Sequence, residues 1–106
     1  MKHVTRLALF LFLFAMLFST WSVADSGGDT FKGKCAMCHG ATGKGDTSMG
    51  KAKGLRDLGS ADVQAQSDAD LAKIINDGKG AMPKYDGKLT KEQIDEVVKF
   101  IRTLKH

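Results

Sequence analysis

The chain has 106 residues, a formal net charge of +4, two cysteines and one proline. This length fits one small domain and leaves no room for a second hydrophobic core. Part of the positive charge lies near the N-terminus, and removal of Lys2 and Arg6 would lower the net charge to +2. The composition therefore gives little support to nucleic-acid binding.

The N-terminal segment has the pattern of a secretory signal peptide. Two basic residues precede an unbroken apolar run over residues 7–18, and small residues occupy the −3 and −1 positions of a cleavage site after Ala24. The run would make about 18 Å of helix, short of the roughly 30 Å of bilayer hydrocarbon. We predict a signal peptide over residues 1–24, a mature domain over 25–106 and no permanent membrane span. An uncleaved anchor is the alternative.

The predicted mature domain has few large apolar side chains. Its aromatic residues are Phe31, Tyr85 and Phe100, and it holds all twelve glycines. A domain of this size with so little core material usually needs a covalent staple or a cofactor. A disulfide between Cys35 and Cys38 is one option in an oxidising compartment. The sequence around the two cysteines favours the other option, a cofactor.

The first predicted element is a short helix over about residues 29–39, capped by Gly28 or Asp29. Residues three and four apart share one face of a helix. The residues so spaced are Phe31, Cys35, Cys38 and His39.

A long loop is predicted next, from Gly40 to about Ala61. Glycines and scattered lysines follow one another there without a sustained apolar period. A structureless loop of this length is unusual unless it wraps a ligand.

The next helix is predicted to span about three turns after the cap Ser67, which with Asp70 forms an acidic variant of the capping box. Its apolar stripe is Leu71, Ile74 and Ile75. The segment 78–87 then has a glycine at either end and Pro83 within it. Because the residue before proline avoids helical geometry, Met82 is predicted to lie on an extended loop.

The last helix is predicted by the strongest sequence pattern in the chain. Thr90 and Gln93 form a capping box, and an apolar stripe follows at helical spacing. The stripe consists of Ile94, Val97, Val98, Ile101 and Leu104. No segment shows the alternation of apolar and polar residues that is typical of a strand, so the predicted fold class is all-α.

The segment CAMCH, residues 35–39, is the attachment motif of a c-type haem. Two thiols one helical turn apart can form thioethers with the two vinyl groups of one porphyrin, and His39 then lies where it can ligate the iron. A thioredoxin-like site would need a βαβ pattern, which is lacking. A zinc site would need more Cys or His than the mature domain offers.

The second axial ligand has several candidates: Met37, Met49, Met82, His106 or a lysine. Met37 lies within the attachment turn and is excluded. Met49 follows His39 by only ten residues, whereas Met82 lies beyond a whole helix on a stiff loop. Methionine more often fills gaps in a core. Beside a haem motif, however, Met82 is the better candidate, since a thioether favours ferrous iron.

Three stretches of the mature domain resemble the class I cytochromes c, particularly the small soluble bacterial and photosynthetic carriers. They are CAMCHG, SDADLAKIINDGKGAMPKYDGKLT and EQIDEVVKFIRTL. The resemblance implies an all-α class I cytochrome c fold wrapped around one haem. It also implies that the first and last helices cross at Gly27, Phe31 and Phe100.

The resemblance implies an electron carrier rather than an enzyme, with one covalently attached haem c and its iron, and the predicted signal peptide indicates that the carrier is periplasmic. Cys35 and Cys38 would form the thioethers, and His39 and Met82 would be the axial ligands. The expected partners are redox proteins, namely membrane cytochrome complexes or a terminal oxidase, and a monomer is expected. A haem enzyme or gas sensor is the main rival, and it would need an open sixth position, which Met82 would close.

Four further expectations stay open. A backbone carbonyl between Lys53 and Leu58 is expected to engage the second nitrogen of His39. Arg56 either bonds a haem propionate or is solvated. Tyr85 either packs near the haem or braces its loop. Lys79, Lys84 and Lys88 form either a cationic rim for partners or a solvated surface of mixed charge.

Overall fold

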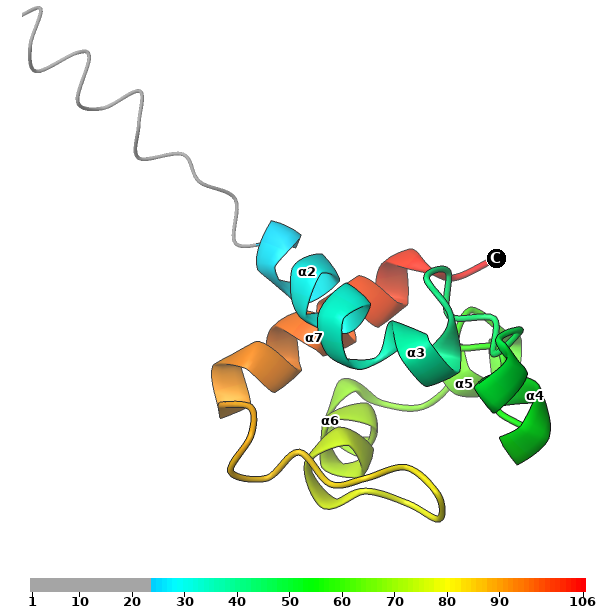
Figure 1. Cartoon of the computed structure of the whole chain (residues 1–106). Helices are drawn as coiled ribbons and strands as arrows, with labels where there is room; N and C mark the ends of the chain where they lie inside the picture. The colour runs from blue at the N-terminus through cyan, green and yellow to red at the C-terminus, as the bar shows by residue number, and fades with distance from the viewer. Residues whose placement is uncertain (1–23) are drawn as a thin grey trace, which may run out of the picture.

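The structure is a computed structural model that describes residues 24–106, and all regular elements in this part of the chain are helices (Figure 1). They are α2 (Ala24–Lys34), α3 (Ala36–His39), α4 (Ser48–Lys53), α5 (Ala61–Gln64), α6 (Asp68–Asp77) and α7 (Lys91–Thr103). The predicted all-α class is confirmed. None of these helices has the length and apolar character needed to cross a membrane.

The prediction of a cleaved signal peptide concerns residues 1–24. All but the last of these lie outside the described residues. The boundary between signal peptide and mature domain therefore stays a prediction.

The two helices with the clearest start signals begin where the sequence predicts. The Ser67 hydroxyl accepts the Asp70 N–H at the start of α6. At the start of α7 the capping box is complete, because the Thr90 hydroxyl accepts the Gln93 N–H (3.1 Å) and the Gln93 side chain accepts the Thr90 N–H (2.9 Å). Both bonds satisfy N–H groups that a helix start leaves unpaired.

Loss of the α7 cap should lower stability measurably. Thr90→Ala removes the hydroxyl acceptor, and we expect the free energy of unfolding to fall by about 1 kcal/mol in denaturant titrations. Lys91→Ala is the control, since its ion pair with Asp95 is largely exposed and such pairs contribute roughly 0–1 kcal/mol. Equal loss in the two variants would show that the cap is not the source of the effect.

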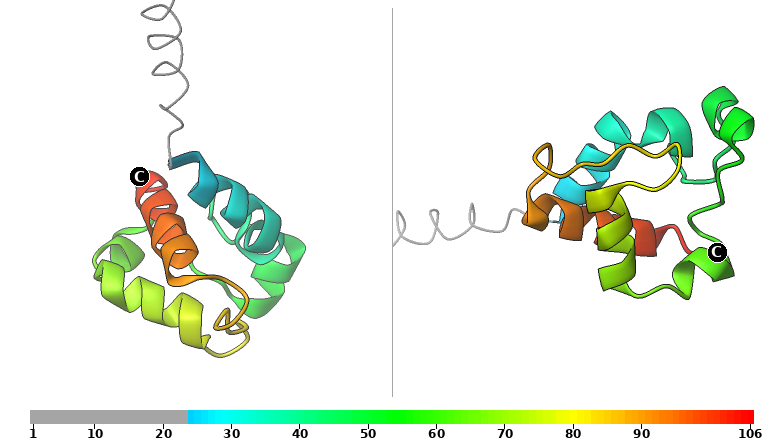
Figure 2. Two further views of the ribbon diagram at one scale, coloured as in Figure 1. Left: turned by 90° about the vertical axis from the view of Figure 1, so that its left-hand side faces the viewer. Right: turned by 90° about the horizontal axis from the view of Figure 1, so that it is seen from below.

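Helices α2 and α7 cross closely, as Figures 1 and 2 show. A Cβ at Gly27 would clash with the backbone carbonyl of Glu96, so only glycine permits this approach. Next to the crossing, the rings of Phe31 and Phe100 pack with their centroids 4.9 Å apart. Phe31 is 1% exposed. The predicted crossing and its three residues are confirmed.

The boundaries predicted for the first helix are wrong at its start and in its middle. It begins at Ala24 rather than near Asp29, because close packing on α7 favours helix across the glycines there. It also breaks at Cys35, whose carbonyl accepts the N–H groups of both Cys38 (3.3 Å) and His39 (2.9 Å). The haem motif thus lies after α2, in a separate turn formed by α3 and its N-cap Cys35.

The loop predicted from Gly40 to about Ala61 contains one helix that the sequence pattern did not reveal, α4. It is capped by Thr47, whose hydroxyl accepts the Gly50 N–H, and it ends at Gly54 in the left-handed conformation (φ 64°). A helix of six residues that holds a glycine has too short an apolar period to be detected. The rest of this loop is irregular up to Ser60.

The core is small and centred on α7. Helices α2 and α6 both pack against α7, and the loop after α6 runs back toward α7 along the lower edge of the molecule in Figure 1. The buried apolar residues are Phe31, Val63, Leu71, Ile75, Leu89, Ile94, Val97, Val98 and Ile101. Several of them also face a cavity between α2–α3 and α6.

Candidate functional site

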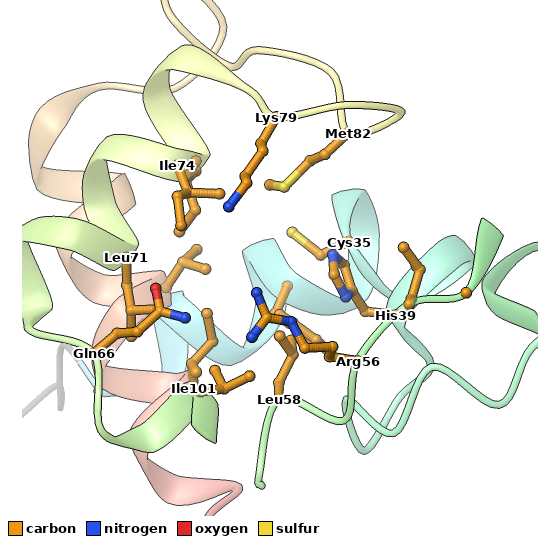
Figure 3. Close-up of a pocket in the computed structure, with 16 residues that line it drawn as sticks. Cys35, His39, Arg56, Leu58, Gln66, Leu71, Ile74, Lys79, Met82 and Ile101 are labelled. Atoms are coloured by element: carbon orange, nitrogen blue, oxygen red, sulfur yellow. The ribbon is translucent and has the colours of Figure 1, made fainter. Parts of the chain in front are cut away.

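A large apolar cavity lies between the haem motif and α6 (Figure 3). The space free of protein atoms within it and at its open mouth is about 960 Å³. Its lining comes from α2 and α3, the α4–α5 connection, α5 and the residues after it, α6 and the loop after it, and α7. The lining residues are Phe31, Cys35, His39, Gly54, Leu55, Arg56, Leu58, Val63, Gln66, Leu71, Ile74, Ile75, Lys79, Met82, Val97 and Ile101. The apolar side chains of α6 and α7 therefore line the cavity and also contribute to the core.

Cys35 lies at one side of this cavity, and Cys38 lies next to it in the same turn. Both line a smaller adjoining pocket that also includes His39, Met82 and Tyr85. The two thiols are free, so the alternative of a disulfide is not what the structure shows. Burial raises the pKa of Cys35 to about 11. The charge of Lys34 has a smaller effect that lowers the pKa, and Cys38 has a smaller effect that raises it. Redox-active cysteines have the opposite shift, a lowered pKa.

His39 closes α3 and turns its ring toward the cavity. The loop after it folds back tightly, since the His39 carbonyl accepts the Gly45 N–H (2.7 Å), and the Thr47 hydroxyl donates to the Cys38 carbonyl (2.7 Å). The ring lies 6.5 Å from that of Phe31. Burial lowers the pKa of His39, so the imidazole is neutral at pH 7 and keeps a lone pair for a metal.

The imidazole of His39 makes no hydrogen bond through either nitrogen to the described part of the chain, and Nδ1 is fully buried. The expected carbonyl partner between Lys53 and Leu58 is therefore wrong for this structure. Two carbonyls of that segment are committed elsewhere, because Asp57 accepts the Ser60 N–H and Leu58 accepts the Gln64 amide. A buried, unpaired imidazole is costly unless a ligand engages it.

Met82 reaches the same cavity from the opposite wall. In Figure 3 its thioether points into the cavity on the side that faces Cys35 and His39. The other sequence candidates lie elsewhere. Met37 is 77% exposed and Met49, on α4, is 43% exposed. His106 is bound to the Asp57 carboxylate at 2.6 Å.

Three polar side chains point into the otherwise apolar cavity in Figure 3, namely Arg56, Gln66 and Lys79. None of the three side chains is hydrogen-bonded to another described residue. Gln66 was not foreseen from the sequence, since it precedes the cap of α6 and belongs to no periodic stripe. Cationic and amide groups at a cavity mouth suit the carboxylates of a cofactor.

These residues fit a covalently held haem. The cavity has apolar walls that suit a porphyrin, and the two thiols lie at its side and in the adjoining pocket. A neutral imidazole without an internal partner faces a thioether across it. A zinc or other multi-carboxylate centre does not fit, because residues 24–106 contain no group of three or more His, Cys, Asp or Glu side chains that could bind a metal ion.

Comparison with known proteins agrees with this arrangement. A family model described as cytochrome c oxidase, cbb3-type, subunit III matches residues 22–101. The chain belongs to the cytochrome c family. Cytochrome c6 of Leptolyngbya boryana is 36% identical over 78 residues, which cover 74% of this chain and 88% of the relative. Cytochrome c6 of Nostoc sp. strain PCC 7120 is 35% identical over 105 residues, which cover 95% and 92%.

The solved structures agree with the sequence relatives. The KustC0563 c-type cytochrome superposes with a TM-score of 0.71 at 32% identity and covers 76% of this chain and 98% of its own. The cytochrome described here is thus a class I c-type cytochrome, an electron-transfer protein with one covalently bound haem c. The predicted family, fold class, cofactor and absence of an enzymatic role are confirmed.

Proposed function

We propose that residues 25–106 act, after export and cleavage behind Ala24, as a periplasmic single-electron carrier. In this proposal Cys35 and Cys38 hold the haem through thioethers, and His39 and Met82 are its axial ligands. The observation that carries the assignment is the placement of His39 and Met82 on opposite walls of one apolar cavity.

The haem iron supplies the redox chemistry, since it passes between the ferrous and ferric states with one electron. The protein residues control that change. His39 offers a neutral nitrogen that suits both states, whereas the soft sulfur of Met82 favours the ferrous one and so raises the reduction potential. The apolar walls formed by α6 and α7 exclude water and disfavour the extra charge of the ferric state.

The partners in this proposal are redox proteins, either membrane cytochrome complexes or a terminal oxidase, in a respiratory or photosynthetic chain, and the carrier works as a monomer. Several lysines lie near Met82 in the sequence, and Lys79, Lys84 and Lys88 are all exposed. Asp77 and Asp86 lie among them and are also exposed. Such a mixed surface suits brief encounters that depend on ionic strength more than tight association.

One experiment tests the carrier assignment. The full chain, produced with a haem c maturation system, should titrate reversibly with the slope of a one-electron couple, and carbon monoxide should leave the spectrum of the reduced protein unchanged. A high-spin spectrum that responds at once to carbon monoxide would indicate an open sixth position and hence a haem enzyme or sensor. The mass of the exported protein, compared with a chain that starts at Asp25, tests the cleavage site.

A further inference from the structure

The segment that carries Met82, residues 78–87, is a tight loop built on α6; we call it the Met82 loop. The N–H groups of Lys79 and Met82 each bond the carbonyl of the other, at 3.2 and 2.9 Å. Gly78, with φ of 75°, starts the reversal, and a Cβ there would lie 2.8 Å from the Met82 carbonyl. These contacts determine the shape of the loop and leave its position relative to the haem motif undetermined.

The backbone anchors of the Met82 loop all lead back to one wall of the cavity. Beyond Met82, the Tyr85 N–H donates to the Ile75 carbonyl (3.1 Å) and the Asp86 N–H to the Asn76 carbonyl (3.0 Å). Both acceptors are in the last turn of α6. The loop is thus fastened to the wall that α6 provides.

The other wall carries Cys35 and His39 and is held differently. Helix α2 packs on α7, and α3 packs on α2 and α4. The two walls are therefore joined mainly through α7, on the inner side of the cavity. Toward the outer side, where Met82 and Cys35 approach each other, a direct link would be needed to fix the gap between them.

Tyr85 supplies that link. Its hydroxyl donates to the Lys34 carbonyl at 3.0 Å, across 51 residues of sequence. Cys38, whose N–H would take this carbonyl in a continuous helix, bonds the Cys35 carbonyl instead, so the Lys34 carbonyl is free to accept from Tyr85. Of the hydrogen bonds described, this one alone connects residues 78–89 with residues 31–53.

The ring of Tyr85 supports the same geometry. It lines the small pocket between Cys35, Cys38 and Met82 and packs against the core. Lys88 lies over its outer side, 5.9 Å from the ring centroid. The ring is therefore packed on its inner side, and its hydroxyl bonds the Lys34 carbonyl at the exposed edge.

We infer that Tyr85 is a positioning residue for the sixth ligand: by tying the Met82 loop to the end of α2 beside Cys35, its hydroxyl sets how closely the Met82 sulfur approaches the iron held by His39. This inference rests on the proposed ligation by Met82. Without the bond the loop keeps its shape and its attachment to α6, but it can move away from the haem motif. An added ligand should then displace Met82 more readily.

The test is a titration of the ferric holoprotein with imidazole, which competes with Met82 for the iron. Tyr85→Phe removes the hydroxyl and keeps the ring, and we expect imidazole to bind about five-fold more tightly than to the wild type, the effect of one hydrogen bond. The matched control is Thr103→Val. It removes an exposed hydroxyl that donates to the Phe100 carbonyl at 2.6 Å, far from the Met82 loop, and should leave imidazole affinity unchanged.

The variant Met82→Ala distinguishes a failure of this inference from a failure of the proposed ligation by Met82. If Met82→Ala binds imidazole much more tightly and Tyr85→Phe binds it as the wild type does, Met82 is the ligand and Tyr85 does not position it. If Met82→Ala also binds imidazole as the wild type does, the ligand assignment itself fails. A Tyr85→Phe variant that only unfolds at a lower denaturant concentration would reduce Tyr85 to a structural brace and overturn the inference.

Rescue provides a second measurement. Replacement of Tyr85 by 4-aminophenylalanine keeps a donor at the same place on the ring, and the imidazole affinity should return toward the wild-type value. Affinity that stays as high as in Tyr85→Phe would mean that the hydrogen bond is not the cause of the change.

Discussion

Met82→Ala should lower the reduction potential by on the order of 0.1 V. A thioether is a soft ligand that stabilises ferrous iron more than ferric iron. Its loss leaves the sixth position to water or to another weak ligand, which favours the ferric state. The same change should make the reduced protein bind carbon monoxide. A spectroelectrochemical titration of the purified holoprotein measures the potential directly.

Met49→Leu is the matched control for this prediction. Met49 is the other methionine that the sequence alone leaves as a candidate, but it lies on α4, is 43% exposed and does not line the cavity. Leucine has a similar volume and no ligand atom, so the potential should stay at the wild-type value. A large fall in Met49→Leu together with none in Met82→Ala would show that the two methionines have been assigned the wrong way round.

Local sequence patterns were sufficient for the elements that depend on neighbouring residues. The caps at Ser67 and Thr90 and the apolar stripe of α7 act within one or two helical turns, and the structure has all of them where they were predicted. The CAMCH motif is local as well. The methionine-proline pair allowed an extended loop to be predicted after α6, and Met82 lies on it.

Features that depend on distant partners could not be predicted in this way. The bond from Tyr85 to Lys34 and the contact of His106 with Asp57 join residues about 50 positions apart. The unpaired Nδ1 of His39 depends on where the carbonyls after Lys53 point. Helix α4 is stabilised chiefly by its cap and by the bond from Thr47 to Cys38, and its own period is too short to detect.

The break at Cys35 has a consequence for the chemistry of attachment. In a continuous helix Cys35 and Cys38 would be fixed on one side of a rod. Here Cys35 follows α2 as the N-cap of α3, and Cys38 lies within α3, so both thiols belong to the turn after the break. We expect covalent attachment to join this turn and the cavity walls into one unit.

Joint replacement of both cysteines should therefore abolish haem attachment and destabilise the fold. In Cys35→Ala/Cys38→Ala we expect no haem stain after denaturing electrophoresis, because no thioether remains. We also expect loss of helical signal in the purified chain, because the apolar cavity would be left without covalently held contents, and residues 24–106 have only nine buried apolar residues. Circular dichroism and thermal unfolding measure the second effect.

The controls separate attachment from general damage to the motif. Met37→Ala changes a residue between the two cysteines that is 77% exposed, and it should carry haem at the wild-type level. Cys38→Ala should still stain through the single thioether of Cys35, with a pyridine haemochrome band shifted toward that of a haem with one intact vinyl group. Stain that survives in the double variant would mean that another residue attaches the haem. Loss of stain in Met37→Ala would mean that the turn, rather than the thiols, limits loading.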